Sequence, residues 1–226
     1  MVHLTRVLLF LSILFTGCAP IRPATDPLQD EHARRLAETA AQFNHDISAA
    51  KGTGWAKVVD QTQTMRYRIA WAAQWPNQMR ITFILSGRPV ETLVATGKSV
   101  TFISHTGRHS QYTMGNPDPD LDHILNLPVK ISDICPVLLG RLPVRPYHDA
   151  YITPSYPEKE IIALFDRKKG PVQHLVFKPD NTLSELSTLD RQQNPAFTFR
   201  IDTMKRLNGR SIPERITFFT PAGDMV

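Results

Sequence analysis

The chain has 226 residues, which is enough for one domain with a substantial core, and 42% of them are hydrophobic while 21% are charged. Eleven Phe, three Trp and five Tyr exclude a disordered chain. The formal net charge of +5 is typical of a solvated surface, although it also favours contact with anionic lipid head groups. Because the sequence has no clustered basic helix and no aromatic RNA-binding motif, we expect no binding to nucleic acid.

The first 17 residues are typical of a targeting segment. Arg6 is followed by an apolar run over 7–15, which is shorter than the roughly 20 residues that a membrane-spanning helix needs. The string Phe-Thr-Gly-Cys at 15–18 resembles the lipobox of bacterial lipoproteins, whose cysteine is diacylated and becomes the mature N-terminus. The resemblance implies a lipoprotein signal peptide over 1–17 and lipid attachment at Cys18. The alternative is an ordinary secretory signal with an incidental cysteine.

The residues after the lipobox-like string favour a tethered domain. Ala19 stands where the sorting rule of enteric bacteria places Asp for inner-membrane retention, so the resemblance implies the outer membrane, with the protein on its periplasmic face. Three prolines over 18–27 predict a lipidated, flexible tether, through which Cys18 would contact the membrane surface. Residues 28–226 are expected to form a single domain. Cys135, the other cysteine, is expected to be a small buried residue.

The spacing of apolar residues predicts the elements in order. Residues 28–47 have apolar positions at three- and four-residue steps and are expected to form an amphipathic helix that packs on the sheet that follows. Residues 118–142 predict two short helices, one around Leu121 and Ile124 and one after the candidate cap Ser132 that ends at Gly140. The predicted strands are 52–60, 64–74, 78–85, 90–95, 100–104, 111–114, 160–166, 171–178, 182–189, 196–204 and 214–220.

These elements predict a fold that is mainly β with helices, of the α+β class. Short turns between the strands allow only antiparallel hairpins. We therefore expect a half-open antiparallel β-barrel of about 10–11 strands, with an N-terminal amphipathic helix and a helical lid insert at 118–142.

Strict alternation over 65–75 and 79–85 places aromatic and aliphatic side chains on one face of the sheet and arginines on the other. This face predicts a groove for an acyl chain, because each methylene group gains roughly 0.8 kcal/mol on burial. The alternative is that the protein's own helices fill the groove. The candidate lining residues are Tyr67, Ile69, Trp71, Met79, Ile81, Phe83 and Phe102.

No string in the sequence predicts catalysis, a metal site or a cofactor. Residues 97–99 resemble the end of a phosphate-binding loop but lack its first glycine, and the acidic run 118–122 lacks the glycine and glutamate of a calcium loop. His105 and His109 flank a turn without a third ligand nearby in sequence, and are interpreted as surface residues. We expect the protein not to be an enzyme.

Three segments within residues 55–143 carry a resemblance to the LolA/LolB fold, in its LolB-like form: Met-Arg-Ile-Thr-Phe-Ile-Leu-Ser-Gly at 79–87, Val-Ala-Thr-Gly-Lys-Ser-Val at 94–100 and Val-Leu-Leu-Gly-Arg-Leu-Pro at 137–143. The resemblance implies an outer-membrane lipoprotein that binds lipid or lipoprotein acyl chains, takes part in lipoprotein localisation and receives cargo from a periplasmic LolA-like carrier. Leu85 matches an exposed loop leucine that passes lipoproteins into the membrane, although it also continues the apolar stripe. The alternative function is a scaffold lipoprotein that binds a protein partner and has no ligand cavity.

Overall fold

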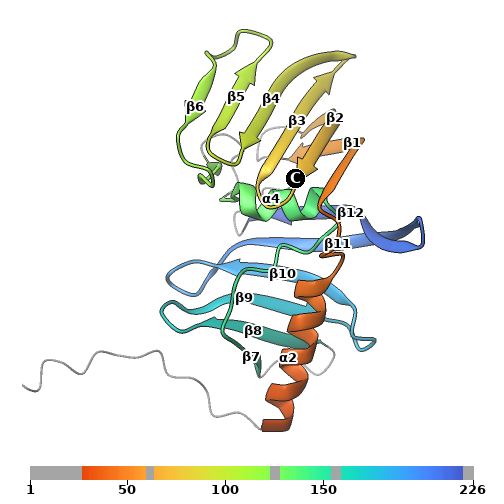
Figure 1. Ribbon diagram of the computed structural model, residues 1–226, viewed down its shortest axis with the longest axis vertical. Coiled ribbons are helices and arrows are strands. Elements are labelled where there is room, and N and C mark those ends of the chain that lie inside the picture. Colours follow the sequence, from red (N-terminus) through yellow and green to blue (C-terminus); the bar gives the residue numbers. More distant parts are fainter. Residues whose placement is uncertain (1–26, 60–63, 123–127, 154–158, 221–226) are drawn as a thin grey trace, which may run out of the picture.

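The computed structural model describes residues 27–59, 64–122, 128–153 and 159–220. Within these ranges the chain forms twelve strands in two six-stranded antiparallel sheets, together with two helices (Figure 1). The molecule is therefore mainly β and of the α+β class, as predicted, and its two sheets do not close into a barrel. The predicted signal peptide, Cys18 and all of the tether except Pro27 lie outside the described residues.

The first sheet is built from consecutive hairpins, so its strands lie in chain order from β1 to β6. Burial confirms the predicted alternation, because residues 65, 67, 69, 71 and 73 are buried or half-buried while 64, 66, 68, 72 and 74 are exposed. We call the more buried side of this sheet its inward face. Its strands are β1 (Ala49–Val59), β2 (Thr64–Gln74), β3 (Gln78–Leu85), β4 (Arg88–Thr96), β5 (Val100–Ser104) and β6 (Tyr112–Met114).

The second sheet is also a meander, in the order β12-β11-β10-β9-β8-β7. Its strands are β7 (Asp149–Thr153), β8 (Glu160–Asp166), β9 (Gly170–Phe177), β10 (Leu183–Leu189), β11 (Pro195–Leu207) and β12 (Arg210–Phe219). The sequence prediction missed β7, a five-residue strand between prolines. It also ended β11 at 204 instead of 207 and began β12 only after Pro213, at 214 instead of 210. Pro213 is tolerated because β12 is an edge strand.

Helix α2 (Pro27–Gln42) packs on β7 and β8 of the second sheet. The expectation that it covers the first sheet is therefore wrong. Four residues with small or aliphatic side chains form its buried face: Ala33, Leu36, Ala37 and Ala40. Arg34 Nε lies 3.1 Å from Asp149 Oδ1 and His32 Nε2 lies 3.1 Å from Glu160 Oε2, so polar contacts also join the helix to β7 and β8.

Helix α4 (Ile131–Leu138) lies between the two sheets, across the end of the first sheet where β2 turns into β3 (Figure 1). Lys130 rather than Ser132 caps its N-terminus, and the Lys130 amide donates to Asp133 Oδ2 at 3.0 Å. The helix ends at the predicted glycine, since Gly140 has a φ of 72°. The other predicted insert helix falls largely on residues 123–127, outside the described ranges. Neither described helix is long and apolar enough to cross a membrane.

Candidate acyl-chain groove on the first sheet

Cross-strand pairing brings the predicted groove residues together on the inward face. Trp71 pairs with Ile81, and Ile81 and Phe102 both pair with Leu93, so four side chains from β2 to β5 form one row. Ile69 and Phe83 pair in the next row. Because side chains alternate along a strand, Tyr67 and Met79 point to the same face. All seven candidates therefore share one surface.

Burial of this surface is uneven. Met79 is 4% exposed and Ile81 is 7% exposed, and both lie at the end of the sheet that α4 crosses. The other five candidates are only half-buried, including the two that share a row with Ile81: Tyr67, Ile69, Trp71, Phe83 and Phe102. Tyr67 and Phe83 contact each other edge to face, with ring centroids 5.8 Å apart. The described core thus covers part of the inward face and leaves the rest partly accessible.

Strand β1 contributes small residues to the same face. The side chains of β2 on this face therefore project further from the sheet than those of β1. A Cβ atom on Gly52 would lie 3.0 Å from the Trp71 ring, and one on Gly54 would lie 3.8 Å from Ile69. The indole of Trp71 therefore lies over the Gly52 backbone. A larger residue at position 52 would displace that ring.

Glu91 is a polar residue of this apolar face that the sequence analysis missed. It pairs with Phe83 across the strands and accepts a hydrogen bond from Ser104 Oγ at 3.2 Å. Its other oxygen, Oε2, is buried and lies 3.2 Å from His109 Nε2, but the geometry is not that of a hydrogen bond. His109 in turn stacks on Phe102 with ring centroids 5.1 Å apart. The position of Glu91 in the alternation of β4 would have revealed its inward orientation.

The two histidines considered as metal ligands have different partners and are both exposed. His105 Nε2 lies 2.9 Å from Thr92 Oγ1, whereas His109 contacts Glu91 and Phe102. Thr92 and Glu91 are adjacent in β4, so the two histidines sit against opposite faces of the sheet. The described part of the chain contains no group of three His, Cys, Asp or Glu residues that could hold a metal ion.

Leu85 lies at the far end of β3 from α4 and is 39% exposed. The turn that follows uses positive φ values at Ser86 and Gly87, 51° and 79°, which give the tight connection to β4. Leu85 pairs with Arg88 across this turn. The side chain thus stands at the tip of a hairpin.

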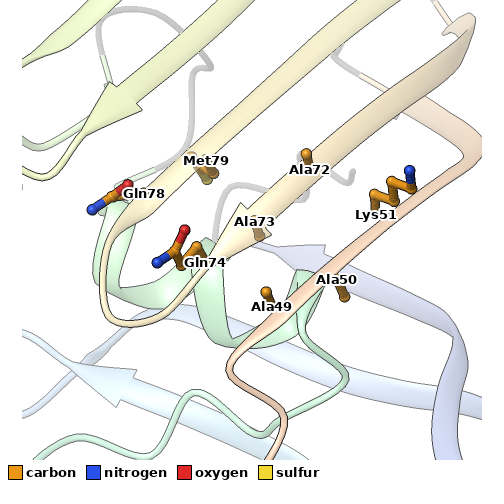
Figure 2. A pocket seen from close by; sticks show the side chains of 8 residues that line it. All are labelled: Ala49, Ala50, Lys51, Ala72, Ala73, Gln74, Gln78 and Met79. Atoms are coloured by element: carbon orange, nitrogen blue, oxygen red, sulfur yellow. The ribbon is translucent and has the colours of Figure 1, made fainter.

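A hollow of about 510 Å³ opens at the other end of the sheet, beside the turn between β2 and β3 (Figure 2). Five of its eight lining residues are exposed and belong to the outward-facing rows: Ala49, Lys51, Ala72, Gln74 and Gln78. Alanine side chains leave the space between the longer lysine and glutamine side chains. Met79 is the one predicted groove residue that lines it, so this hollow is separate from the half-buried part of the inward face.

Two sets of contacts hold α4 in place. The C-terminal end is tied to the linker between α2 and β1, where Arg141 Nε donates to the Ile47 carbonyl at 3.0 Å and Asn44 Nδ2 donates to the Gly140 carbonyl at 2.9 Å. At the other end, Arg145 Nη2 lies 3.0 Å from Asp133 Oδ2.

Cys135 lies on the buried side of α4 and is fully buried, as the sequence predicts. Its Sγ is 3.7 Å from the Gln74 carbonyl oxygen. Burial raises the pKa of the Cys135 thiol to about 11, because the charged thiolate is poorly solvated there.

No protein-family model matches the sequence, and no curated protein matches it either. Solved structures do share its backbone arrangement. A LolA superfamily protein from Nitrosomonas europaea has a TM-score of 0.54 and 12% identity, over 85% of this chain and 88% of that one. A domain named for outer-membrane lipoprotein sorting, from Vibrio parahaemolyticus, has a TM-score of 0.58 and 6% identity, over 87% and 88%. The fold is LolA/LolB-like.

The resemblance predicted from the three segments of the sequence is thus confirmed for the fold. A DUF1329 family protein from Desulfovibrio piger also has this arrangement, with a TM-score of 0.60 and 10% identity over 89% of this chain and 90% of that one. The LolA/LolB-like fold therefore includes the second sheet, although the sequence resemblance covers only residues 55–143.

Proposed function

We propose that this protein binds the acyl chains of lipids or lipoproteins on the inward face of its first sheet and takes part in lipoprotein localisation at the outer membrane. The observation that carries the proposal is the set of five half-buried residues: Tyr67, Ile69, Trp71, Phe83 and Phe102. An apolar ligand would complete their burial, gaining roughly 0.8 kcal/mol for each methylene group that leaves water. The LolA/LolB-like fold supports this reading.

Glu91 narrows the class of ligand. A carboxylate on the rim of the groove disfavours the anionic head of a free fatty acid, because two like charges would lie close together in a partly desolvated place. A diacylglyceryl group, as found on lipoproteins, is neutral. The amide N–H groups of the cysteine that carries it could donate to the buried Glu91 Oε2, which lacks a hydrogen-bond donor within the described residues.

Helix α4 serves as the lid in this proposal. Its C-terminal end is fixed by Asn44 and Arg141, so opening would pivot there and would separate Cys135 from the β2–β3 turn. Such a movement would extend the accessible groove from Trp71 towards Met79. Cargo would arrive from a periplasmic LolA-like carrier, and Leu85 at its hairpin tip would pass it into the bilayer.

Lipid attachment at Cys18 and residence on the periplasmic face of the outer membrane complete the proposal, which rests here on the lipobox-like string. Labelled palmitate should enter the wild-type protein in cells and should be absent from Cys18→Ser. Palmitate in both proteins would contradict attachment at this residue.

The binding experiment uses a fluorescent diacylglyceryl lipopeptide and the purified protein. We expect saturable binding that an unlabelled lipoprotein competes. Phe83→Gln should weaken it at least tenfold, about 1.4 kcal/mol, because the ring is part of the inward face. Ile84→Gln is the matched control, since Ile84 is the next residue of β3, is also half-buried and faces outward.

Equal loss in the two variants would mean that binding does not occur on the inward face. Absence of saturable binding in the wild-type protein would remove the carrier function and leave a scaffold that binds a protein partner.

A further inference from the structure

The strands of the first sheet carry an excess of positive over negative charge equal to that of the whole chain. Strands β1 to β6 contain six Lys or Arg residues and one acidic residue, Glu91, which faces inward. The whole chain has 26 Lys and Arg and 21 Asp and Glu, so 20 of each lie elsewhere. The formal net charge of +5 therefore equals the charge of these six strands alone.

Five of the six cations lie on the outward face of β1, β2 and β3, and all five are exposed. They are Lys51, Lys57, Arg66, Arg68 and Arg80. Pairing sets them side by side, because Lys57 is opposite Arg66 and Lys51 shares Ala72 as a neighbour with Arg80. We call these five residues together with Trp55 the basic face.

No carboxylate of the described residues forms an ion pair with any cation of the basic face. Some exposed cations elsewhere on the molecule do have acidic partners, as Arg34 has Asp149 and Arg210 has Asp46. Repulsion among these neighbouring like charges disfavours such a face in isolation. An anionic surface would offset this repulsion.

Trp55 gives the basic face an apolar centre. It is 63% exposed, the largest value among the big apolar side chains of the described residues, and the Arg66 guanidinium lies 4.4 Å from the centre of its ring. Trp55 pairs with Arg68 across the strands, and Arg68 pairs with Ile84. Ile84 precedes Leu85, which stands at the tip of the β3–β4 hairpin. An indole among cations suits the interface between lipid head groups and acyl chains.

We propose that the basic face docks on the surface of an anionic phospholipid membrane. The cations are spread over three strands, which matches an extended charged plane better than a single small ligand. The exposed Trp55 and the nearby Leu85 favour a bilayer over an acidic protein or a nucleic acid, because only a bilayer has an apolar layer just beneath its charges. In this orientation the inward face points away from the membrane.

The proposal goes beyond acyl-chain binding and is tested without it. The protein as isolated from its membrane is reconstituted on vesicles of phosphatidylcholine alone and on vesicles that also contain phosphatidylglycerol. Lysine acetylation is then measured residue by residue. Acetylation of Lys51 and Lys57 should be slower on the anionic vesicles by a factor of about five or more. High salt should abolish this protection. Lys168 and Lys169, at a turn of the second sheet, should react equally on both.

Two double variants distinguish docking through the basic face from attraction by the net charge of the whole protein. Each cation near an anionic surface contributes a factor of about five, so Arg66→Gln/Arg68→Gln should lower the ratio of docked to undocked protein about 25-fold and remove the protection of Lys51 and Lys57. Arg167→Gln/Arg191→Gln removes the same charge from exposed turns of the second sheet and should keep it.

Equal acetylation of Lys51 and Lys57 on the two kinds of vesicle would overturn the proposal and favour an acidic macromolecule as the partner. Protection that survives Arg66→Gln/Arg68→Gln would overturn it as well. Neither outcome depends on lipopeptide binding, so the docking surface and the groove succeed or fail separately.

Discussion

Replacing Gly140 with alanine should loosen the contact between α4 and the second sheet. Gly140 has a φ of 72°, a region that costs alanine about 1–2 kcal/mol relative to glycine. An added Cβ would also lie 3.3 Å from Ile212 Cγ2 on β12. Crowding of this kind costs typically 1–3 kcal/mol, so we expect a total loss of about 2–5 kcal/mol in the free energy of unfolding.

The matched control is Gly209→Ala. Gly209 has a φ of 79°, but an added Cβ there would meet no atom within 4 Å. This variant should lose only the conformational part, about 1–2 kcal/mol. The difference between the two variants then measures the contact with Ile212.

Urea unfolding, followed by circular dichroism, gives the free energies of both variants and the wild-type protein. The slopes with urea should stay equal, because the same surface becomes exposed on unfolding. Equal destabilisation by the two substitutions would refute the reasoning. It would mean that Gly140 and Ile212 are not held in contact and that the C-terminal end of α4 is free to move.

Three further predictions concern buried polar groups. Burial lowers the pKa of His174 below its usual 6.5, so the unfolded chain binds the proton more readily; stability should fall as the pH drops below about 6.5, and urea midpoints should show a smaller fall for His174→Gln. The raised pKa of Cys135 should make its reaction with a maleimide at pH 7 slow in the folded protein and fast in urea; fast reaction without urea would indicate that α4 opens readily. Asp133→Ala should destabilise the protein by about 3 kcal/mol in the same urea assay, since Arg145 would lose its buried partner, whereas a loss below 1 kcal/mol would show that the pair contributes little.

The strands of the first sheet could be predicted because alternation has a local cause. From Met65 to Gln74 the burial of every residue except the half-buried Ala70 follows the period of two, whereas Trp75, which the pattern assigns to the inward face, lies in the turn and is exposed. Strand β7 could not be predicted in this way. Its five residues include no clear alternation, and it is stabilised by pairing with β8 and packing against α2, which depend on distant parts of the chain.

The candidate site was predictable to the same extent. The inward positions of the seven groove residues follow from β-strand geometry, whereas their unequal burial depends on which distant parts of the chain pack against each of them. The period of three to four residues predicted an amphipathic helix, but not its end at Gln42 rather than 47 and not its packing partner, because periodicity states which residues are apolar and not which sheet they meet. Glu91 was missed because the groove was predicted from apolar residues alone, and Glu91 is an acidic residue at an inward position of β4.

In both sheets every strand pairs only with its neighbours in sequence. Most native pairings therefore require only short loops to close, which favours rapid and independent folding of each meander. The contacts between the β11–β12 hairpin and the start of the chain are different, since Arg210 and Asp46 are 164 positions apart. We expect these long-range contacts to form last. The two sheets would then fold separately before they pack together.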